Sequence, residues 1–206
     1  MAKFVKLLTT SVAAFTLFLL ASVASAAPLQ FTQTEKEVLY NQYVEIVADV
    51  VSQHDGAILE VAPMEMFSDA DWIAPEEFKQ LAIGRANTTI KIVPTDANVI
   101  TPFGTSFGSK SATISSSGLS RTVTASGSFE TGYNSTAGRQ VFMGINSLTS
   151  SMSGTGTWKQ TGYTPSRIDG GRTYAIALSG TFTINGLVSG HHINYEFYCS
   201  AVGGVS

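Results

Sequence analysis

Three polar side chains near the C-terminus are of types that can do chemistry. His192, Asn194 and Glu196 occupy alternate positions in an otherwise apolar run, a spacing that puts all three on one face of a β-strand. A histidine and a glutamate on one face could act as base and acid, or ligate a metal ion. Because positions four apart on a strand are separated by about 13 Å, one ion cannot bridge them. The spacing favours a solvated polar face, and a ligand-binding row is the alternative.

Two aromatic side chains extend this candidate set. Trp158 and Tyr163 lie in a segment rich in glycine and threonine. Exposed aromatic rings on a rigid sheet can stack on sugars or anchor a partner protein. The candidate ligand-binding residues are therefore Trp158, Tyr163, His192, Asn194 and Glu196, with core packing as the alternative role of Trp158.

Catalytic signatures are lacking in the sequence. It contains no Gly-x-Ser-x-Gly nucleophile motif, no His-Glu-x-x-His zinc motif and no Walker-type loop. Its single cysteine, Cys199, excludes an intrachain disulfide and fits a small buried hydrophobe. Asp69 and Asp71 could form a metal pair, but their position before a predicted helix favours capping. We predict no catalytic residue, metal or cofactor; a hydrolase using Glu196 with His192 or Asp169 is an alternative.

A β-hairpin must position the polar row. Apolar and polar residues alternate from Arg172 to Ile184 and again from Ile193 to Cys199. Between these runs, Asn185-Gly186 suits the two left-handed positions of a type I′ turn. A two-residue turn pairs Leu178 with Ile193 and brings the apolar sides of both strands onto one face, whereas a slip of one residue would not.

The remaining chain divides into a helical front and a β-rich rear. Residues 33–53 form an amphipathic pattern with Thr34 and Glu37 as a capping box, and such a helix needs an apolar surface to cover. A second helix is predicted to begin at Pro75, with Phe78, Leu81 and Ala82 buried. Ile58–Met64 is a short strand or an extended linker. Period-two runs predict further strands at Thr89–Val93, Ser111–Ser116, Ser120–Phe129, Arg139–Thr149 and Gly154–Gln160.

Charge separates the same two parts. Residues 27–99 contain 12 acidic and 4 basic residues, and residues 100–206 contain 3 acidic and 6 basic ones. Neither balance suggests a nucleic-acid partner. The predicted fold is α+β, with N-terminal amphipathic helices followed by a mostly antiparallel β-sandwich or barrel. The predicted divisions are a signal peptide at 1–26, an acidic helical segment at 27–86 and a Ser/Thr/Gly-rich β domain at 87–206.

The N-terminus has the features of a secretory signal peptide. Lys3 and Lys6 precede an apolar run, and Ala24-Ser25-Ala26 provides a small-residue cleavage site. The run is short for a membrane span, and no cluster of basic residues follows it. We therefore expect a secreted, extracellular protein without a stable membrane span after cleavage.

The front also resembles a known kind of leader region. Thr34-Glu35-Lys36-Glu37, Tyr43-Val44-Glu45-Ile46 and the run from Asp71 to Phe78 resemble the N-terminal half of exported proteins of Gram-positive bacteria with no assigned function. The resemblance implies export and a two-part layout, and it transfers no site residue.

Three functional hypotheses follow from these observations. The leading one is a secreted, non-enzymatic β-rich protein that binds a glycan or a protein at the cell surface or in the medium. The second is the exported hydrolase described above. The third is a secreted toxin or effector whose acidic front acts as a pro-segment over the basic rear.

Overall fold

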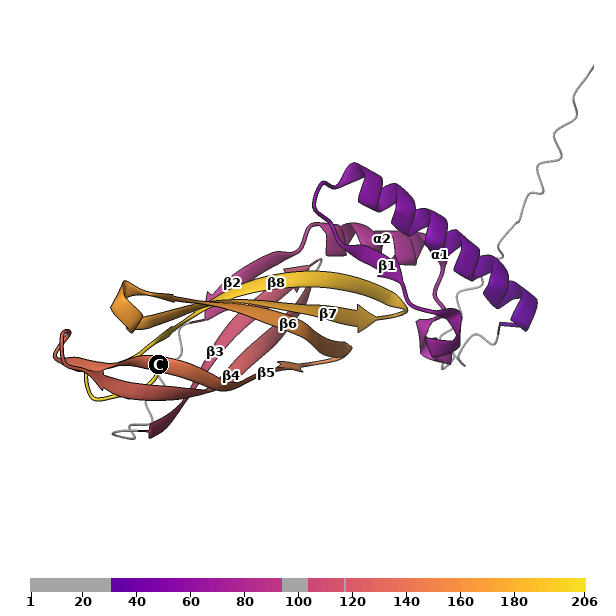
Figure 1. Cartoon of the computed structure of the whole chain (residues 1–206). Coiled ribbons are helices and arrows are strands. Elements are labelled where there is room, and N and C mark those ends of the chain that lie inside the picture. Colours follow the sequence, from indigo (N-terminus) through magenta and orange to yellow (C-terminus); the bar gives the residue numbers. More distant parts are fainter. Residues whose placement is uncertain (1–30, 94–103, 117) are drawn as a thin grey trace, which may run out of the picture.

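The computed structural model describes residues 31–93, 104–116 and 118–206, in which two α-helices and eight strands form (Figure 1). The predicted signal peptide, residues 1–26, lies outside the described residues. In chain order the elements are α1 (Gln33–Gln53), β1 (Leu59–Val61), two 3₁₀ turns (Met64–Met66 and Asp69–Asp71), α2 (Pro75–Ala86), β2 (Thr89–Val93), β3 (Gly104–Ser116), β4 (Leu119–Asn134), β5 (Arg139–Ser153), β6 (Thr157–Ile168), a third 3₁₀ turn (Asp169–Gly171), β7 (Thr173–Ile184) and β8 (Leu187–Tyr198).

The strands form two antiparallel sheets of four strands each, in the orders β1-β8-β7-β6 and β2-β3-β4-β5. The sheets lie face to face and do not close on each other, so the fold is the predicted α+β sandwich rather than a barrel (Figure 1). Because β1 comes from the acidic front and pairs with β8, the front and the rear share a sheet.

The closing hairpin has the predicted register. Ile184 pairs with Leu187 and Leu178 with Ile193 across the turn. Both turn residues are left-handed, with φ of 49° at Asn185 and 68° at Gly186, as a type I′ turn requires. The two strand patterns and the turn therefore agree on a single alignment.

Four strands, β3 to β6, extend beyond the bounds that their sequence patterns predicted, and β3 and β6 do so most. β3 begins at Gly104 rather than Ser111, through a segment where glycines face each other in the pairing of Gly108 with Gly127. Such a segment has little apolar alternation to reveal it. β6 continues from Gln160 to Ile168 and passes through Pro165, which is tolerated because β6 is an edge strand.

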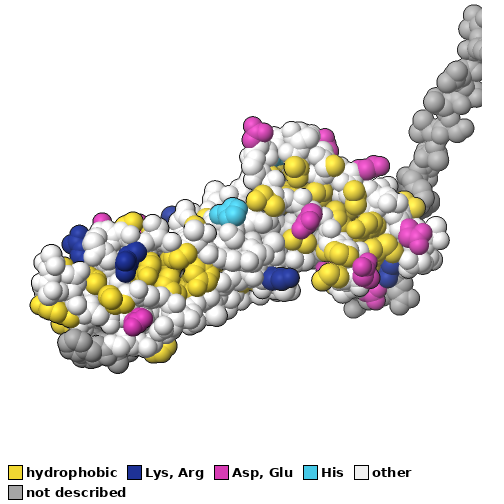
Figure 2. Space-filling model, viewed as in Figure 1, with side chains coloured by type: hydrophobic (Ala, Val, Ile, Leu, Met, Phe, Trp, Pro, Cys, Tyr) yellow, Lys and Arg dark blue, Asp and Glu magenta, His cyan; other side chains and the backbone are white. Residues whose placement is uncertain are grey.

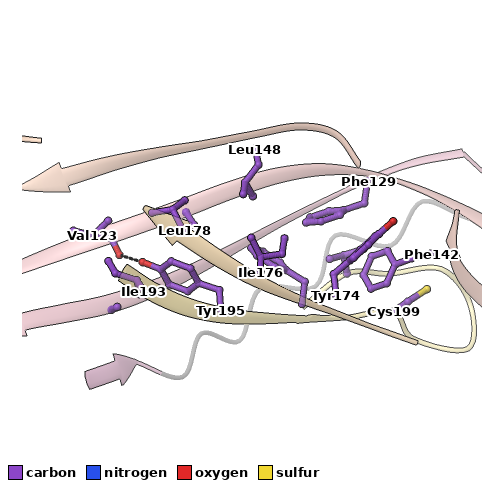
Figure 3. Packing of buried hydrophobic residues seen from close by; sticks show 14 of the residues in the cluster. Val123, Phe129, Phe142, Leu148, Tyr174, Ile176, Leu178, Ile193, Tyr195 and Cys199 are labelled. Atoms are coloured by element: carbon purple, nitrogen blue, oxygen red, sulfur yellow. Dashed lines mark hydrogen bonds between the residues drawn. The ribbon is translucent and has the colours of Figure 1, made fainter. Parts of the chain in front are cut away.

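The apolar side of the hairpin packs against the second sheet (Figure 3). Ile176, Leu178 and Ile193 are fully buried there. The hydroxyl of Tyr195 donates a hydrogen bond of 2.9 Å to the carbonyl of Val123 and so ties β8 to β4. Burial raises the pKa of this phenol. Cys199 is buried in the same core, as predicted.

Helix α1 has the predicted bounds but a different cap. Thr32 and Glu35 form the capping box: the Glu35 amide donates to the Thr32 hydroxyl at 3.4 Å, and the Thr32 amide donates to the Glu35 carboxylate at 2.8 Å. The predicted Thr34–Glu37 box is wrong. Both pairs have the spacing of a capping box, and the helix start at Gln33 selects the earlier one.

An aromatic cluster joins the helices to the hairpin tip. The rings of Tyr43 and Phe78 stack at 3.9 Å, and the amide of Ile73 donates to the Tyr43 hydroxyl at 2.9 Å. Phe78 and Ala82 are buried as predicted, while Leu81 is half-buried. We call this group the helical cluster, consisting of Tyr43, Val47, Val50, Trp72, Phe78, Ala82 and Leu187. Helix α1 thus packs on α2 and β1, because the second sheet already covers the apolar face of the hairpin.

Acidic side chains gather over the helical part, with hydrophobic side chains between them (Figure 2). Asp71 caps its own turn by accepting from the Ser68 amide at 2.8 Å, and Asp69 pairs with Lys36 at 2.9 Å. These two aspartates therefore have the capping and surface roles that their position favoured. Within the described residues, no helix is long and apolar enough to cross a membrane.

Candidate functional site

Four side chains form a row on the outer face of β8. His192, Asn194, Glu196 and Tyr198 are all exposed, and they alternate with the buried residues of the strand. We call these four residues the outer row. Tyr198, which was not among the predicted site residues, adds an aromatic ring that is 45% exposed.

Small residues of β7 lie beside the outer row. Ser179 pairs with His192, Ala177 with Asn194 and Ala175 with Glu196. Directly opposed residues on a sheet share a face, so the longer side chains of β8 stand above a low neighbouring strand. His192, Asn194 and Glu196 are therefore accessible from the β7 side, whereas Tyr198 pairs with Thr173, which is buried.

Hydrogen bonds hold both ends of the outer row. The Ser179 hydroxyl and Nδ1 of His192 share a hydrogen bond of 2.9 Å. At the other end, the Tyr198 hydroxyl donates to a carboxylate oxygen of Glu196. This hydrogen bond raises the pKa of Tyr198, with a smaller contribution from desolvation. The Lys110 ammonium lies 5.4 Å from the centre of the Tyr198 ring.

Trp158 and Tyr163 lie apart from the outer row. Trp158 pairs with the buried Phe182 and Tyr163 with the buried Leu178, so both rings have the inward parity of β6. Trp158 is half-buried against the sandwich core, and its Nε1 donates to the Ser150 hydroxyl at 2.9 Å. Tyr163 is 38% exposed at the sheet edge. The five predicted residues thus divide into three on the outer face and two on the inner side.

The geometry does not pair a catalytic acid with a base. His192 and Glu196 are four residues apart on β8, about 13 Å along the strand, whereas two groups acting on one glycosidic bond are about 5 to 9.5 Å apart. Asp169 accepts a hydrogen bond of 2.8 Å from the Thr173 hydroxyl. Among the described residues, no group of three or more His, Cys, Asp or Glu could hold a metal ion.

A cavity of about 180 Å³ lies where the end of α2 meets β1, β2 and β8. We call it the junction cavity. Its polar lining includes Arg85, Thr88, Ser189, His191 and His192, and its apolar lining includes Ile58 and Ile90. His192 belongs to both this cavity and the outer row, so the two features adjoin.

His191 is the buried histidine of the junction cavity. Only 7% of its surface is exposed, and its Nε2 lies 2.8 Å from the Ser189 hydroxyl, which is itself 3.3 Å from the carbonyl of Phe182. Since the hydroxyl has one proton and the carbonyl can only accept, Nε2–H of a neutral His191 is the donor to Ser189. Burial lowers the pKa of His191 to about 4, and the positive charges of Arg85 and His192 add to this effect.

Sequence reasoning missed Arg85 and His191 as a pair. They lie on α2 and β8, more than a hundred residues apart in the chain, and no motif links them. The alternation in β8 did put His191 on the inward face, opposite to His192. That signal predicted burial but not the arginine beside it.

Comparison with protein-family models, curated proteins and solved structures finds no match to this chain. Function is therefore inferred from the geometry of the outer row and the junction cavity.

Proposed function

We propose that the protein is exported and binds a glycan along the outer row of β8 without catalysing a reaction on it. The observation that carries this proposal is the set of four exposed polar and aromatic side chains on a single strand face, beside a β7 strand of small residues. A rigid hairpin fixes their spacing, which lowers the entropy lost when a ligand is bound.

The chemistry of the outer row suits a sugar. Asn194 supplies both a donor and an acceptor, and Glu196 supplies acceptors, so together they can satisfy vicinal hydroxyl groups. The exposed ring of Tyr198 offers an apolar face on which a pyranose can stack. A protein partner would be expected to need a larger apolar centre, and the row is mainly polar.

Separation of His192 from Glu196 supports binding rather than hydrolysis. Each is already hydrogen-bonded to a neighbour on the sheet, and the distance along the strand keeps them from acting on one bond. Export rests on the predicted signal peptide, which precedes all the described elements.

A glycan array probed with the purified protein tests this proposal. We expect retention of at least one glycan, and Asn194→Ala and Tyr198→Ala should each weaken binding about tenfold, because each removes a direct hydrogen bond or a stacking surface. Asn41→Ala is the matched control, since Asn41 is an exposed asparagine of α1. Binding that neither row substitution weakens, capture of a protein in place of any glycan, or turnover of the bound sugar would contradict the proposal.

A further inference from the structure

A buried guanidinium without an acceptor lies at the junction cavity. Arg85 is 4% exposed, and its Nε and Nη2 are buried with no hydrogen-bond partner among the described residues. Among the residues that the structure describes, the one ion pair joins Lys36 and Asp69. Within residues 31–93, 104–116 and 118–206, no carboxylate therefore neutralises Arg85.

Neighbouring groups stabilise this charge only in part. The guanidinium carbon lies 4.1 Å from the centre of the Phe182 ring, a cation–π contact. Arg85 is in the last turn of α2, where the helix dipole favours a cation. The carbonyl of Ile83 at that end accepts from the Asn87 amide at 3.1 Å and from the Asn87 side chain at 2.9 Å. No described residue accepts a hydrogen bond from Nε or Nη2 of Arg85.

Nearby charges make the position more positive. Burial, with a smaller contribution from the like charge of Arg121, lowers the pKa of Arg85 to about 10. His191 and His192 share the cavity with Arg85. A buried cation beside other cationic or neutral basic groups is costly unless an anion joins it.

The junction cavity has room for that anion. Its volume of about 180 Å³ is well above the ~10–15 Å³ that a cavity needs in order to hold one water molecule. Planar guanidinium groups bind carboxylate and phosphate oxygens through paired N–H donors, and such charge-assisted bonds are among the stronger ones in proteins.

We propose that the junction cavity binds a small oxyanion, a carboxylate or phosphate group, with Arg85 as its cationic anchor and His191 and His192 beside it. This site is distinct from the glycan contacts of the outer row, although His192 adjoins both. The anion could be free in the medium or could be the acidic group of a sugar. Its binding does not depend on Asn194, Glu196 or Tyr198 of the outer row.

Nuclear magnetic resonance of the Arg85 side-chain Nε–H and the His191 ring tests this inference. Sodium phosphate, sodium acetate and sodium glucuronate are titrated separately against sodium chloride at constant ionic strength and pH. We expect at least one of them to shift both signals with saturation in the millimolar range or below. A preference for glucuronate would assign the anion to an acidic sugar, and a preference for phosphate or acetate to a free ion.

Two substitutions separate the anchor from the general charge of the protein. Arg85→Gln, and Arg85→Met where the first variant folds poorly, should weaken the response of His191 at least about tenfold, because the charged donor is lost. Arg172→Gln should leave the response of His191 unchanged, since Arg172 is an exposed arginine that donates to the Asp169 carbonyl.

The inference is overturned if none of the three anions gives a saturable shift in the wild type, or if a folded Arg85 variant responds as the wild type does. Loss of glycan binding by the outer-row variants with the anion response intact would separate the two sites.

Discussion

At the scale of single residues, His191 shows how burial and neighbouring charge act together. Its ring lines the junction cavity beside Arg85, and its hydrogen bond to Ser189 replaces one bond to water. In the unfolded chain its pKa returns to about 6.5. The unfolded state therefore binds the proton more readily than the folded one.

This difference predicts a loss of stability in weak acid. Because the folded pKa of about 4 is depressed below the unfolded value, the unfolded state takes up more protons as pH falls from about 6.5 to 4, and the free energy of unfolding falls across that window. The shift corresponds to about 3 kcal/mol at its limit. Urea unfolding at a series of pH values measures it.

Histidine variants assign this pH dependence to one residue. His191→Gln should flatten the stability profile between pH 6.5 and 4, whereas His192→Gln should leave most of the slope, because His192 is exposed. An unchanged slope in His191→Gln would show that other groups cause the acid sensitivity.

Residue types and parity revealed part of the site. Alternation put His192, Asn194 and Glu196 on one exposed face, and the structure does the same. The alternation could not reveal the junction cavity, because this cavity forms only where the end of α2 meets β8. Nor could parity place Trp158, whose strand contains a bulge between Gln160 and Gly162.

At the scale of elements, the hairpin tip carries two roles at once. Gly186 has φ of 68°, and a Cβ at this position would lie 2.0 Å from the ring of Phe67. That ring is held by Tyr40 at 5.9 Å and Trp72 at 4.8 Å between ring centres. The turn therefore requires glycine both for its backbone and for the docking of the helical part.

Alanine substitutions separate these two requirements. Gly186→Ala should lower the free energy of unfolding by about 3 kcal/mol, from left-handed strain and from displacement of Phe67. Gly170→Ala should cost only about 1 kcal/mol, because Gly170 has a similar φ of 65° with open space around its Cβ. Thermal or urea unfolding measures both changes. Equal losses in the free energy of unfolding would mean that the Phe67 ring moves aside without a measurable energetic cost.

Local signals defined most elements. Helix α1, the start of α2 and the hairpin register follow from periodicity, proline and the Asn-Gly turn, which act over a few residues. The capping box was misplaced by two residues because two Thr-x-x-Glu sequences overlap. The pairing of β1 with β8 was not predictable, because three residues carry too little pattern to specify a partner strand.

At the scale of the whole molecule, the helical part and the sandwich are joined through β8. Leu187 at the start of that strand belongs to the helical cluster, and β1 pairs with the same segment. The Gly190 amide also donates to the carbonyl of Ile58 at 2.8 Å. Disrupting one part should therefore disrupt the other.

This connection predicts one cooperative unfolding transition. Trp72 is buried in the helical cluster and Trp158 lies against the sandwich core, so each tryptophan reports on one part. The Trp158→Phe variant keeps Trp72, and the Trp72→Phe variant keeps Trp158. In each variant, unfolding in denaturant followed by fluorescence and by circular dichroism should have the same midpoint and the same slope. An early loss of the Trp72 signal, before the sheets unfold, would show that the acidic front is an independent segment.

The central claim is that the outer row of β8 holds the ligand, and mapping the bound glycan tests it most directly. A glycan retained on the array would be titrated into isotope-labelled protein while backbone and side-chain resonances are followed. We predict saturable shifts at His192, Asn194, Glu196 and Tyr198, with smaller ones at the adjoining residues of β7. Shifts confined to the surface of α1, or no shifts on β8 at saturation, would contradict the claim.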